Sequence, residues 1–284
     1  MSHEPSSIRD LEGIHLSKTI LITGTSTGFG KELVLQFAKR EWNVVATMRD
    51  TSKAAAEFSQ YSNVQVLALD ITNQEMTHEV VDAVTRQYGR IDVLLNNAGY
   101  AQAGIFEEVS VDQARQQYET NVFGVMTTIQ AVLPQMREHR SGHIINISSM
   151  GGVQSLPTLS IYCSSKAALE NLSEGLAAEV KGLGVNLTLV EPAGFKTGFQ
   201  GNTQEITSDI PDYQPLYDWY NDLAETAPYG DVEKAMSAVA DIAGTDNPPR
   251  RLALGSMGLV MARTQLNGML EEYDKWEHIT ASAD

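Results

Sequence analysis

Tyr162 and Lys166 are spaced for acid–base chemistry. They lie four residues apart in the segment YCSSKAAL, whose later residues are good helix formers. Residues i and i+4 share a helix face, so the phenol and the ammonium can lie side by side. A phenol titrates at about pH 10, and a nearby cation stabilises its phenolate and lowers that pKa. The pair is a candidate general acid–base site, although this spacing is also frequent on helices by chance.

Polar residues come directly after two apolar runs that read as buried strands. Ser148 and Ser149 lie at the end of one run, and the sequence NNAG, residues 96–99, lies at the end of another. The carboxyl ends of parallel strands are where ligands bind in open α/β sheets. A serine hydroxyl there can hydrogen-bond a substrate carbonyl oxygen. The hydroxyl and the Asn96–Gly99 run are therefore expected at one crevice.

The sequence TGTSTGFG, residues 23–30, links a predicted strand to a helical pattern. Backbone N–H groups at a helix N-terminus favour a pyrophosphate, and glycines let the backbone approach it. The spacing departs from G-x-G-x-x-G, so a purely structural turn is the alternative for the loop alone. The loop is interpreted as a dinucleotide site because the second and third predicted strands also end in residues suited to a nucleotide.

Met48, Arg49 and Asp50 end the second predicted strand, where a doubly wound fold meets the adenosine ribose. Met48 cannot accept a hydrogen bond from a 2′-hydroxyl, whereas Arg49 can pair with a 2′-phosphate. NADP(H) is therefore predicted over NAD(H), the alternative being that Asp50 serves the ribose. Asp70, after the third strand, is placed to accept from the adenine amino group, or else to cap the helix after Thr72.

Short apolar runs alternate with helical patterns along most of the chain, which indicates βαβ units. The runs lack polar alternation, as in a parallel sheet covered on both faces. We predict an α/β fold, a single-domain Rossmann-type doubly wound sheet of about seven parallel strands with helices on both faces. The predicted strands are Thr19–Thr23, Val44–Thr47, Val64–Leu69, Val93–Asn96, His143–Ser148, Val185–Val190 and Arg251–Leu254.

The same alternation predicts the domain organisation. Residues 1–16 are polar and are predicted to be a flexible leader, and residues 17–284 a single catalytic domain. One stretch, about residues 197–233, breaks the alternation: it has no Lys or Arg but six aromatic residues. It is interpreted as a substrate lid, the alternative being a surface helical pair that buries its aromatics on the core. The aromatics are Phe199, Tyr213, Tyr217, Trp219, Tyr220 and Tyr229.

Composition narrows the classes of function. The chain has 284 residues, 42% hydrophobic and 20% charged, with a formal net charge of −16. Such a charge repels nucleic acid and anionic lipid, and no apolar stretch is long enough to span a bilayer. The single Cys163 and the absence of a secretory signal favour the cytoplasm. No metal is expected, because a helix-breaking Ser-Gly separates His139 from His143 and no acid or Cys clusters nearby.

Taken together, the loop at 23–30, the NNAG run, Ser149, Tyr162 and Lys166 resemble the short-chain dehydrogenase/reductase family over roughly residues 18–260. The resemblance implies an oxidoreductase. The family's serine lies thirteen residues before its tyrosine, which selects Ser149 over Ser148. It implies that Tyr162 transfers the proton and that Lys166 lowers the tyrosine pKa and holds the nicotinamide ribose.

The resemblance extends to further residues. Asn121 matches the asparagine that keeps a water in the proton relay, and Pro192 and Thr197 match the segment that contacts the carboxamide. Ala193 departs from the usual glycine, with a glycine one position later. The C-terminal stretch 247–256 resembles members related to hydroxysteroid and retinol dehydrogenases. The predicted cofactor-binding residues are Gly24, Thr25, Ser26, Gly28, Phe29, Gly30, Arg49, Asp70, Ile71, Asn97, Ala98, Gly99, Tyr162, Lys166, Pro192 and Thr197.

The predicted function is NADP(H)-dependent hydride transfer to or from a small molecule, a neutral and apolar ketone, aldehyde or secondary alcohol. Relatives are often dimers or tetramers, so a homodimer or homotetramer is expected by analogy. Two alternatives are an epimerase or dehydratase with a tightly held cofactor, and a catalytically idle NADP-binding sensor or scaffold. Retention of Asn121, Ser149, Tyr162 and Lys166 argues against the sensor. Cofactor oxidation with a panel of ketones separates the three.

Overall fold

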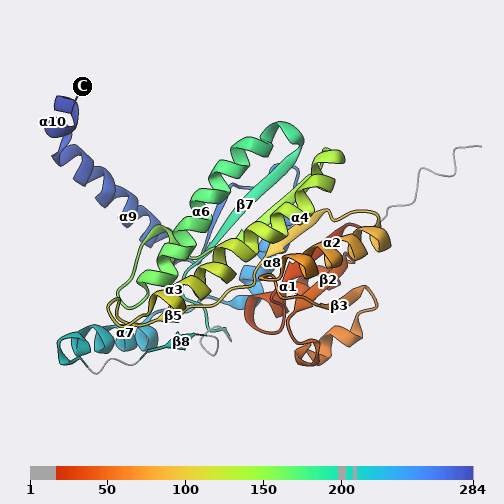
Figure 1. The fold of residues 1–284 in the computed structure, drawn as a ribbon, viewed down its shortest axis with the longest axis horizontal. Coiled ribbons are helices and arrows are strands. Elements are labelled where there is room, and N and C mark those ends of the chain that lie inside the picture. Colours follow the sequence, from red (N-terminus) through yellow and green to blue (C-terminus); the bar gives the residue numbers. More distant parts are fainter. Residues whose placement is uncertain (1–16, 198–202, 207–209, 284) are drawn as a thin grey trace, which may run out of the picture.

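A computed structural model of the chain describes residues 17–197, 203–206 and 210–283 (Figure 1). Seven parallel strands form one sheet in the order β3-β2-β1-β4-β6-β7-β9. The seven predicted strands are the seven of this sheet, with ends that differ by at most two residues. The expected leader at 1–16 lies outside the described residues. The strands are β1 (Thr19–Thr23), β2 (Asn43–Met48), β3 (Val64–Ala68), β4 (Val93–Asn96), β6 (Gly142–Ile147), β7 (Val185–Pro192) and β9 (Arg251–Leu254).

The strand order makes the fold doubly wound, as predicted. The chain runs outward from β1 through β2 to β3 and then returns to the other side of β1 as β4. The order reverses between β1 and β4, and open α/β sheets bind ligands at that point. The glycine loop after β1 and the NNAG run after β4 therefore meet at the carboxyl edge of the sheet.

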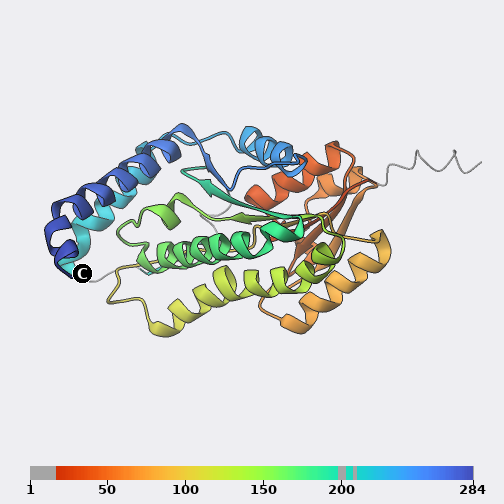
Figure 2. The ribbon, with the colours of Figure 1, turned by 90° about the horizontal axis from the view of Figure 1, so that it is seen from above.

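Both faces of the sheet are covered by helices. Every β1 residue is buried although successive side chains point to opposite faces, so each face must be packed against other elements. Ile20 and Ile22 pack in one core cluster with α1 and α8, and Leu21 packs in another with α2, α4 and α6. Figure 2 shows these helices on the two sides of the sheet. Their bounds are α1 (Gly28–Lys39), α8 (Val232–Ala243), α2 (Gln74–Tyr88), α4 (Val125–Glu138) and α6 (Ser160–Val180).

Three features were not predicted. A π-helix, η4 (Glu119–Gly124), interrupts the long helix that begins as α3 (Val111–Tyr118) and continues as α4. A small parallel sheet joins β5 (Gln102–Ala103) to β8 (Gln204–Glu205). A long C-terminal helix, α9 (Ser256–Lys275), follows the last strand.

The remaining elements are short or peripheral. They are the helices α5 (Met150–Val153), α7 (Gln214–Thr226) and α10 (Glu277–Thr280), and the 3₁₀ turns Thr51–Lys53, Ala56–Gln60, Lys181–Leu183, Pro211–Tyr213 and Ala281–Ala283.

Among the described residues, no helix combines the length and the apolar content that crossing a bilayer requires.

Replacing Gly30 with alanine tests how closely α1 packs on the glycine loop. A Cβ at Gly30 would overlap the Gly24 carbonyl oxygen and the Asn97 amide nitrogen. We expect Gly30→Ala to lower the free energy of unfolding by about 1–3 kcal/mol, because overpacking forces the backbone to shift.

Gly175→Ala is the matched control, since nothing lies within 4 Å of a Cβ added at this exposed position of α6. It should raise the free energy of unfolding by about 0.5–1 kcal/mol. Urea denaturation measures both variants, and equal effects would contradict the close packing of the loop.

Candidate active site

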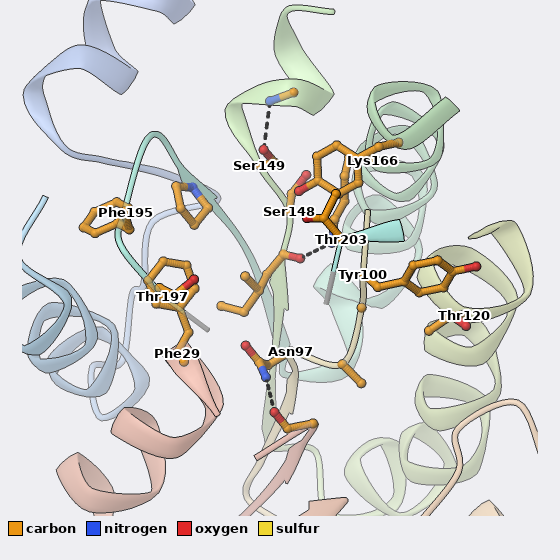
Figure 3. A pocket seen from close by; sticks show the side chains of 18 of the residues that line it. Phe29, Asn97, Tyr100, Thr120, Ser148, Ser149, Lys166, Phe195, Thr197 and Thr203 are labelled. Carbon is orange, nitrogen blue, oxygen red and sulfur yellow. Dashed lines mark hydrogen bonds between the residues drawn. The ribbon is translucent and has the colours of Figure 1, made fainter. Parts of the chain in front are cut away.

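A cavity of about 1400 Å³ opens at the carboxyl ends of the strands (Figure 3). Almost all the predicted catalytic and cofactor-binding residues line it, although they come from loops spread over nearly the whole sheet. Only Thr25, Gly30 and Asn121 of the predicted set do not line the cavity. The three belong to the layer of residues that supports its wall.

The glycine loop has the conformation that its sequence predicts. Gly24 and Gly28 have φ angles of 70° and 57°, in the left-handed region that favours glycine. The Asn97 side chain donates to the carbonyl oxygens of Thr23 (3.0 Å) and Gly24 (2.7 Å). Thr25 donates its hydroxyl to the Thr47 carbonyl at 3.1 Å, so it ties the loop to β2.

Two cationic side chains line the cavity beside the end of β2. Arg49 lines the wall, and Lys53, which the sequence analysis missed, also lines it. Asp50 accepts hydrogen bonds at Oδ1 from the Ser52 N–H (3.0 Å) and hydroxyl (2.6 Å), which lower its pKa. A second cation four residues after Arg49 was the signal that could have identified Lys53.

Asp70 combines parts of its two predicted roles. It lines the cavity, and its Oδ1 accepts from the Thr72 N–H (3.0 Å) and hydroxyl (2.7 Å). The N-cap of α2 is instead Asn73, whose side chain accepts from the Met76 N–H. Asp70 therefore orders the turn before α2 and does not cap the helix.

Ser149, Tyr162 and Lys166 lie together on the wall beside β6. Ser149 is the N-cap of α5 and shares a hydrogen bond with the Tyr162 side chain. The Lys166 Nζ donates to the Ile147 carbonyl at 2.8 Å and lies 6.0 Å from the centre of the Tyr162 ring. Tyr162 and Lys166 are only 8% and 5% exposed. The predicted side-by-side arrangement on α6 is confirmed.

Burial sets the titration of this pair. It raises the pKa of Tyr162 above its usual value, and the Ser149 hydrogen bond lowers it by less. Burial also lowers the pKa of Lys166 to about 8, opposed by the negative charge of Glu170. The sequence predicted a lowered pKa for Tyr162, and the structure has the opposite direction because desolvation of the phenolate outweighs the hydrogen bond from Ser149.

Asn121 lies behind the wall, within the π-helix. It is fully buried, and its amide nitrogen donates to the Tyr100 carbonyl (3.0 Å) and the Ser165 hydroxyl (3.1 Å). Its Oδ1 accepts from the Tyr100 N–H at 3.2 Å. A Cβ added at Gly99 would lie 3.1 Å from that oxygen and 3.6 Å from the Lys166 Nζ. Asn121 thus lies close to the lysine without reaching the cavity surface; π-bulges often occur at functional sites.

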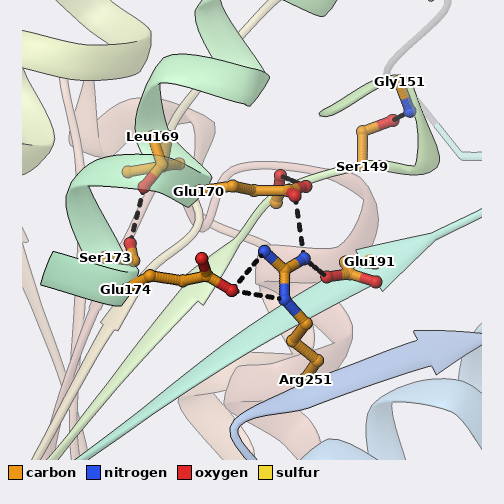
Figure 4. A network of polar contacts seen from close by, with 9 residues as sticks. Ser149, Gly151, Leu169, Glu170, Ser173, Glu174, Glu191 and Arg251 are labelled. Carbon is orange, nitrogen blue, oxygen red and sulfur yellow. Dashed lines mark hydrogen bonds and ion pairs between the residues drawn. The ribbon is translucent and has the colours of Figure 1, made fainter. Parts of the chain in front are cut away.

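A partly buried network of carboxylates around Arg251 supports the site, and the sequence did not predict it (Figure 4). Glu170, one helical turn after Lys166, accepts from the Ser148 hydroxyl at 2.7 Å. Arg251 of β9 donates to Glu170 at 2.9 Å, to Glu174 at 2.8 Å and to Glu191. The four-residue steps from Tyr162 to Lys166 and Glu170 could have identified Glu170 from the sequence. No local pattern could have identified Arg251 as its partner, because the two residues are 81 positions apart.

The segment after β7 follows a defined path despite Ala193. The Ala193 N–H donates to the Leu254 carbonyl at 3.2 Å, and the Gly194 carbonyl accepts from the Gly230 N–H at 2.9 Å. The ring of Phe195 meets that of Phe29 edge-on, with centroids 5.3 Å apart. Pro192 and Thr197 both line the cavity, as predicted.

The aromatic segment is only partly described, and its aromatics differ in position. Tyr220 and Tyr229 line the cavity, whereas Trp219 is 43% exposed. The Tyr217 hydroxyl donates to the Ile206 carbonyl at 3.0 Å, which joins α7 to the chain after β8. Phe199 lies outside the described residues.

The two histidines with metal-like spacing lie in different environments. The ring of His143 is buried against the Thr188 hydroxyl (2.9 Å), and burial lowers its pKa to about 4, while His139 is exposed. Within the part of the chain that the structure describes, no three His, Cys, Asp or Glu residues group as metal ligands would.

Comparison with known proteins decides the family. The family model for short chain dehydrogenases matches residues 18–207. This chain belongs to the short-chain dehydrogenase family. Its relatives include a 3-ketodihydrosphingosine reductase of Bacteroides thetaiotaomicron, 36% identical over 85% of this chain and 89% of that protein. Retinol dehydrogenase 8 of Homo sapiens is 33% identical over 82% of this chain and 80% of that protein.

Solved structures of the family share the fold. A short-chain dehydrogenase from Streptomyces avermitilis has a TM-score of 0.88 and 36% identity, covering 94% of this chain and 98% of its own. ElxO with NADP bound has a TM-score of 0.74 and 27% identity over 86% of this chain and 99% of its own. A member from Burkholderia phymatum in complex with NAD, 22% identical with a TM-score of 0.78 over 90% of this chain and 95% of its own, shares the fold. The chain is therefore an oxidoreductase of this family.

Removing the buried charge of Lys166 should stabilise the protein without ligands. A lysine with a pKa of about 10.4 when unfolded and about 8 when folded binds its proton less readily in the folded state. Below pH 8 this opposes folding, and the cost disappears as the pH rises toward about 10.4. We expect Lys166→Met to raise the free energy of unfolding at pH 7 by about 1–3 kcal/mol.

Denaturant unfolding at pH 7 and pH 9.5 measures this gain, which should shrink at the higher pH. Lys181→Met, at an exposed position just after α6, is the control and should change little. Destabilisation by Lys166→Met at both pH values would show that the ammonium's hydrogen bond to Ile147 outweighs its burial.

Proposed function

We propose that this enzyme transfers a hydride between NADP(H) and a neutral, apolar ketone, aldehyde or secondary alcohol. The observation that carries the proposal is the convergence of Ser149, Tyr162 and Lys166 on one cavity with the glycine loop and Arg49. The cavity, at about 1400 Å³, exceeds the roughly 300–1,000 Å³ of a typical single-ligand pocket, which supports room for a dinucleotide and a substrate together.

The residues present fit a dinucleotide. A Cβ at Gly24 would lie 2.6 Å from the Ala98 Cα, so the loop needs glycine to approach the β4 edge. The N-cap residue of α1, Thr27, makes no side-chain hydrogen bond to the first turn, which leaves the helix N-terminus suited to a pyrophosphate. Bound NADPH supplies the hydride that the protein itself cannot.

The protein's own residues handle the proton. In the direction of reduction, the Tyr162 hydroxyl donates its proton to the substrate oxygen as the carbonyl carbon becomes tetrahedral. Ser149 holds that oxygen by a hydrogen bond. The Lys166 ammonium stabilises the tyrosinate that remains, and Asn121 holds the Tyr100 backbone beside the lysine. Oxidation of an alcohol uses the same groups in reverse.

The preference for NADP(H) rests on charge at the end of β2. Arg49 and Lys53 both line the cavity there and can pair with a 2′-phosphate. Asp50 has Oδ1 engaged by Ser52, which favours Arg49 over Asp50 as the group that meets the ribose. ElxO, a relative that binds NADP, supports the same choice.

The substrate end of the cavity is apolar. Tyr220 and Tyr229 line it from the partly described lid, and Met257 and Met261 line it from the base of α9. Residues 197–233 carry no Lys or Arg to pair with an anionic substrate. Relatives named for retinol and for a ketodihydrosphingosine agree with an apolar alcohol or ketone. In a cell, a preference for NADP(H) favours reduction.

Tyr162→Phe tests the proton donor. We expect kcat to fall by about 10²–10⁴-fold, the range for removing a general acid, while NADPH still binds with similar affinity. Stopped-flow NADPH oxidation with a panel of ketones and aldehydes measures the rate, and fluorescence titration measures binding.

Tyr88→Phe is the control, because that hydroxyl, at the end of α2, pairs with Gln65 away from the cavity. Full activity of Tyr162→Phe would refute the proposed acid. Failure of the unmodified protein to oxidise NADPH with any of these compounds would favour the sensor or the epimerase instead.

Arg49→Ala tests the cofactor preference. We expect the KM for NADPH to rise about tenfold or more and that for NADH to change little, since about 1.4 kcal/mol of charge-assisted binding is lost only with the 2′-phosphate. Steady-state kinetics with both cofactors measures the ratio. Arg86→Ala, on α2, is the control, and a parallel rise for NADH would count against the assignment.

A further inference from the structure

The face of α6 that carries Tyr162 and Lys166 continues for one more turn to Glu170. Residues four apart share a helix face, so the three side chains form one row. At the end of β6, the Lys166 Nζ donates to the Ile147 carbonyl. The Glu170 Oε1 accepts from the hydroxyl of the next residue, Ser148, at 2.7 Å. Glu170 is 4% exposed and does not line the cavity. A buried carboxylate therefore holds the strand end from behind the site.

The contact between Glu170 and Ser148 lies next to the serine of the site. Ser149 directly follows Ser148, and its own partner in the row is the Tyr162 side chain. Each residue from 147 to 149 is thus bound by a different side chain of α6. A strand end held at three successive residues leaves the Ser149 hydroxyl little freedom. Such precision matters, because a misplacement of about 1 Å can cost an active site about 10²-fold in rate.

The Glu170 carboxylate is fixed on its remaining sides. Its Oε2 accepts from Arg251 of β9 at 2.9 Å (Figure 4). Helix α5 passes so close that a Cβ added at Gly152 would overlap the Glu170 Oε1 and lie 3.0 Å from the Ser148 hydroxyl oxygen. Only glycine leaves room for the carboxylate there. With both oxygens engaged and α5 packed over them, Glu170 cannot turn away from Ser148.

Glu170 also brings negative charge close to Lys166. Burial lowers the pKa of Lys166 to about 8, and the charge of Glu170 opposes that shift. The charged groups around the Glu170 carboxylate are Lys166 and Glu174 of α6, Glu191 of β7 and Arg251 of β9. Three carboxylates share the Arg251 guanidinium, so the group keeps a net negative charge. The lysine's polar neighbours Tyr162 on α6 and Asn121 on η4 are neutral near pH 7. Of these groups, Glu170 is therefore the one whose charge favours the ammonium.

We propose that Glu170 is a positioning residue of the active site and that Arg251 holds it in place. Glu170 acts through two neighbours. It anchors the Ser148 hydroxyl so that Ser149 faces the substrate oxygen, and it keeps the Lys166 ammonium charged. This role rests on the proposed function, since the serine and the ammonium matter through the reaction proposed for them. Glu170 itself touches neither substrate nor cofactor.

Glu170→Gln removes the charge and keeps the shape of the side chain. We expect the alkaline fall of kcat/KM for ketone reduction to move from about pH 8 to about one unit lower, because Lys166 loses its opposite charge. With that shift kcat/KM falls about fivefold at pH 8 and about twofold at pH 7, and changes little at pH 6. Steady-state NADPH oxidation at saturating NADPH measures the profile. An equal fall at every pH, or an unmoved profile, would overturn the proposal.

Three further variants separate charge from position. Glu174→Gln removes another carboxylate from Arg251 at a position 47% exposed, and as the matched control it should leave the alkaline fall in place. Glu170→Asp keeps the charge but shortens the reach to Ser148. It should restore the alkaline fall to that of the unmodified protein and lower kcat about tenfold at every pH. Ser148→Ala should have the same effect as Glu170→Asp. Full kcat in both of these variants would also overturn the proposal.

Denaturant unfolding without ligands tests the charge separately from activity. A lysine whose pKa is lower when folded destabilises the fold below that pKa, and the cost shrinks as the pH rises toward about 10.4. Lys166→Met should therefore stabilise the Glu170→Gln protein more than the unmodified protein at pH 7, and the difference should vanish at pH 9.5. Equal gains at pH 7 would overturn the proposal. If the unmodified protein oxidises no NADPH, the proposed function fails, and the unfolding measurement still decides whether Glu170 acts on Lys166.

Discussion

The site depends on a lysine ammonium held almost completely out of water. Lys166 is 5% exposed, and desolvation lowers its pKa toward neutrality. The ammonium remains tolerable because the Ile147 carbonyl accepts a hydrogen bond and the Glu170 carboxylate lies one helical turn away. Glu170 in turn is buried and needs its own partners, Ser148 and Arg251. The charge that the proposed reaction uses at Lys166 is thus balanced by charges and polar groups from several elements behind it.

That balance also connects distant parts of the fold. Arg251 joins α6 to β7 and β9 through three carboxylates, so the edge strand β9 and the site helix are bound to each other. Glu170 and Glu191 form the buried end of this network, where burial raises the pKa of Glu191, whereas Arg251 and Glu174 are partly exposed. Buried ion pairs often add little net stability, because desolvation offsets their attraction. In this protein the ion pairs of Arg251 hold α6 in place and partly neutralise its carboxylates Glu170 and Glu174.

The two ends of the cavity are built differently, one mainly from backbone and the other mainly from side chains. The proposed dinucleotide end is built from backbone: positive φ at Gly24 and Gly28, and an Asn97 side chain that fixes the loop. The proposed substrate end is lined by side chains from the partly described segment 197–233 and from the base of α9. The β5–β8 pair and the Tyr217 hydroxyl attach this segment to neighbouring parts of the chain. Backbone recognition suits an invariant ligand such as a pyrophosphate, and side chains suit one that differs between relatives.

The sequence alone determined the seven strands, the glycine loop and the Tyr162–Lys166 pair. Each depends on neighbours in sequence: apolar runs, glycine spacing, and the four-residue step of a helix. The tertiary structure decided the rest. Thr25 and Asn121 proved to support the wall because their burial depends on the elements that pack over them, and the π-helix around Asn121 has no periodic signal. Arg251 reaches Glu170 across 81 residues, and β5 pairs with β8 across about a hundred. Such contacts form only when the sheet assembles, so no local pattern encodes them.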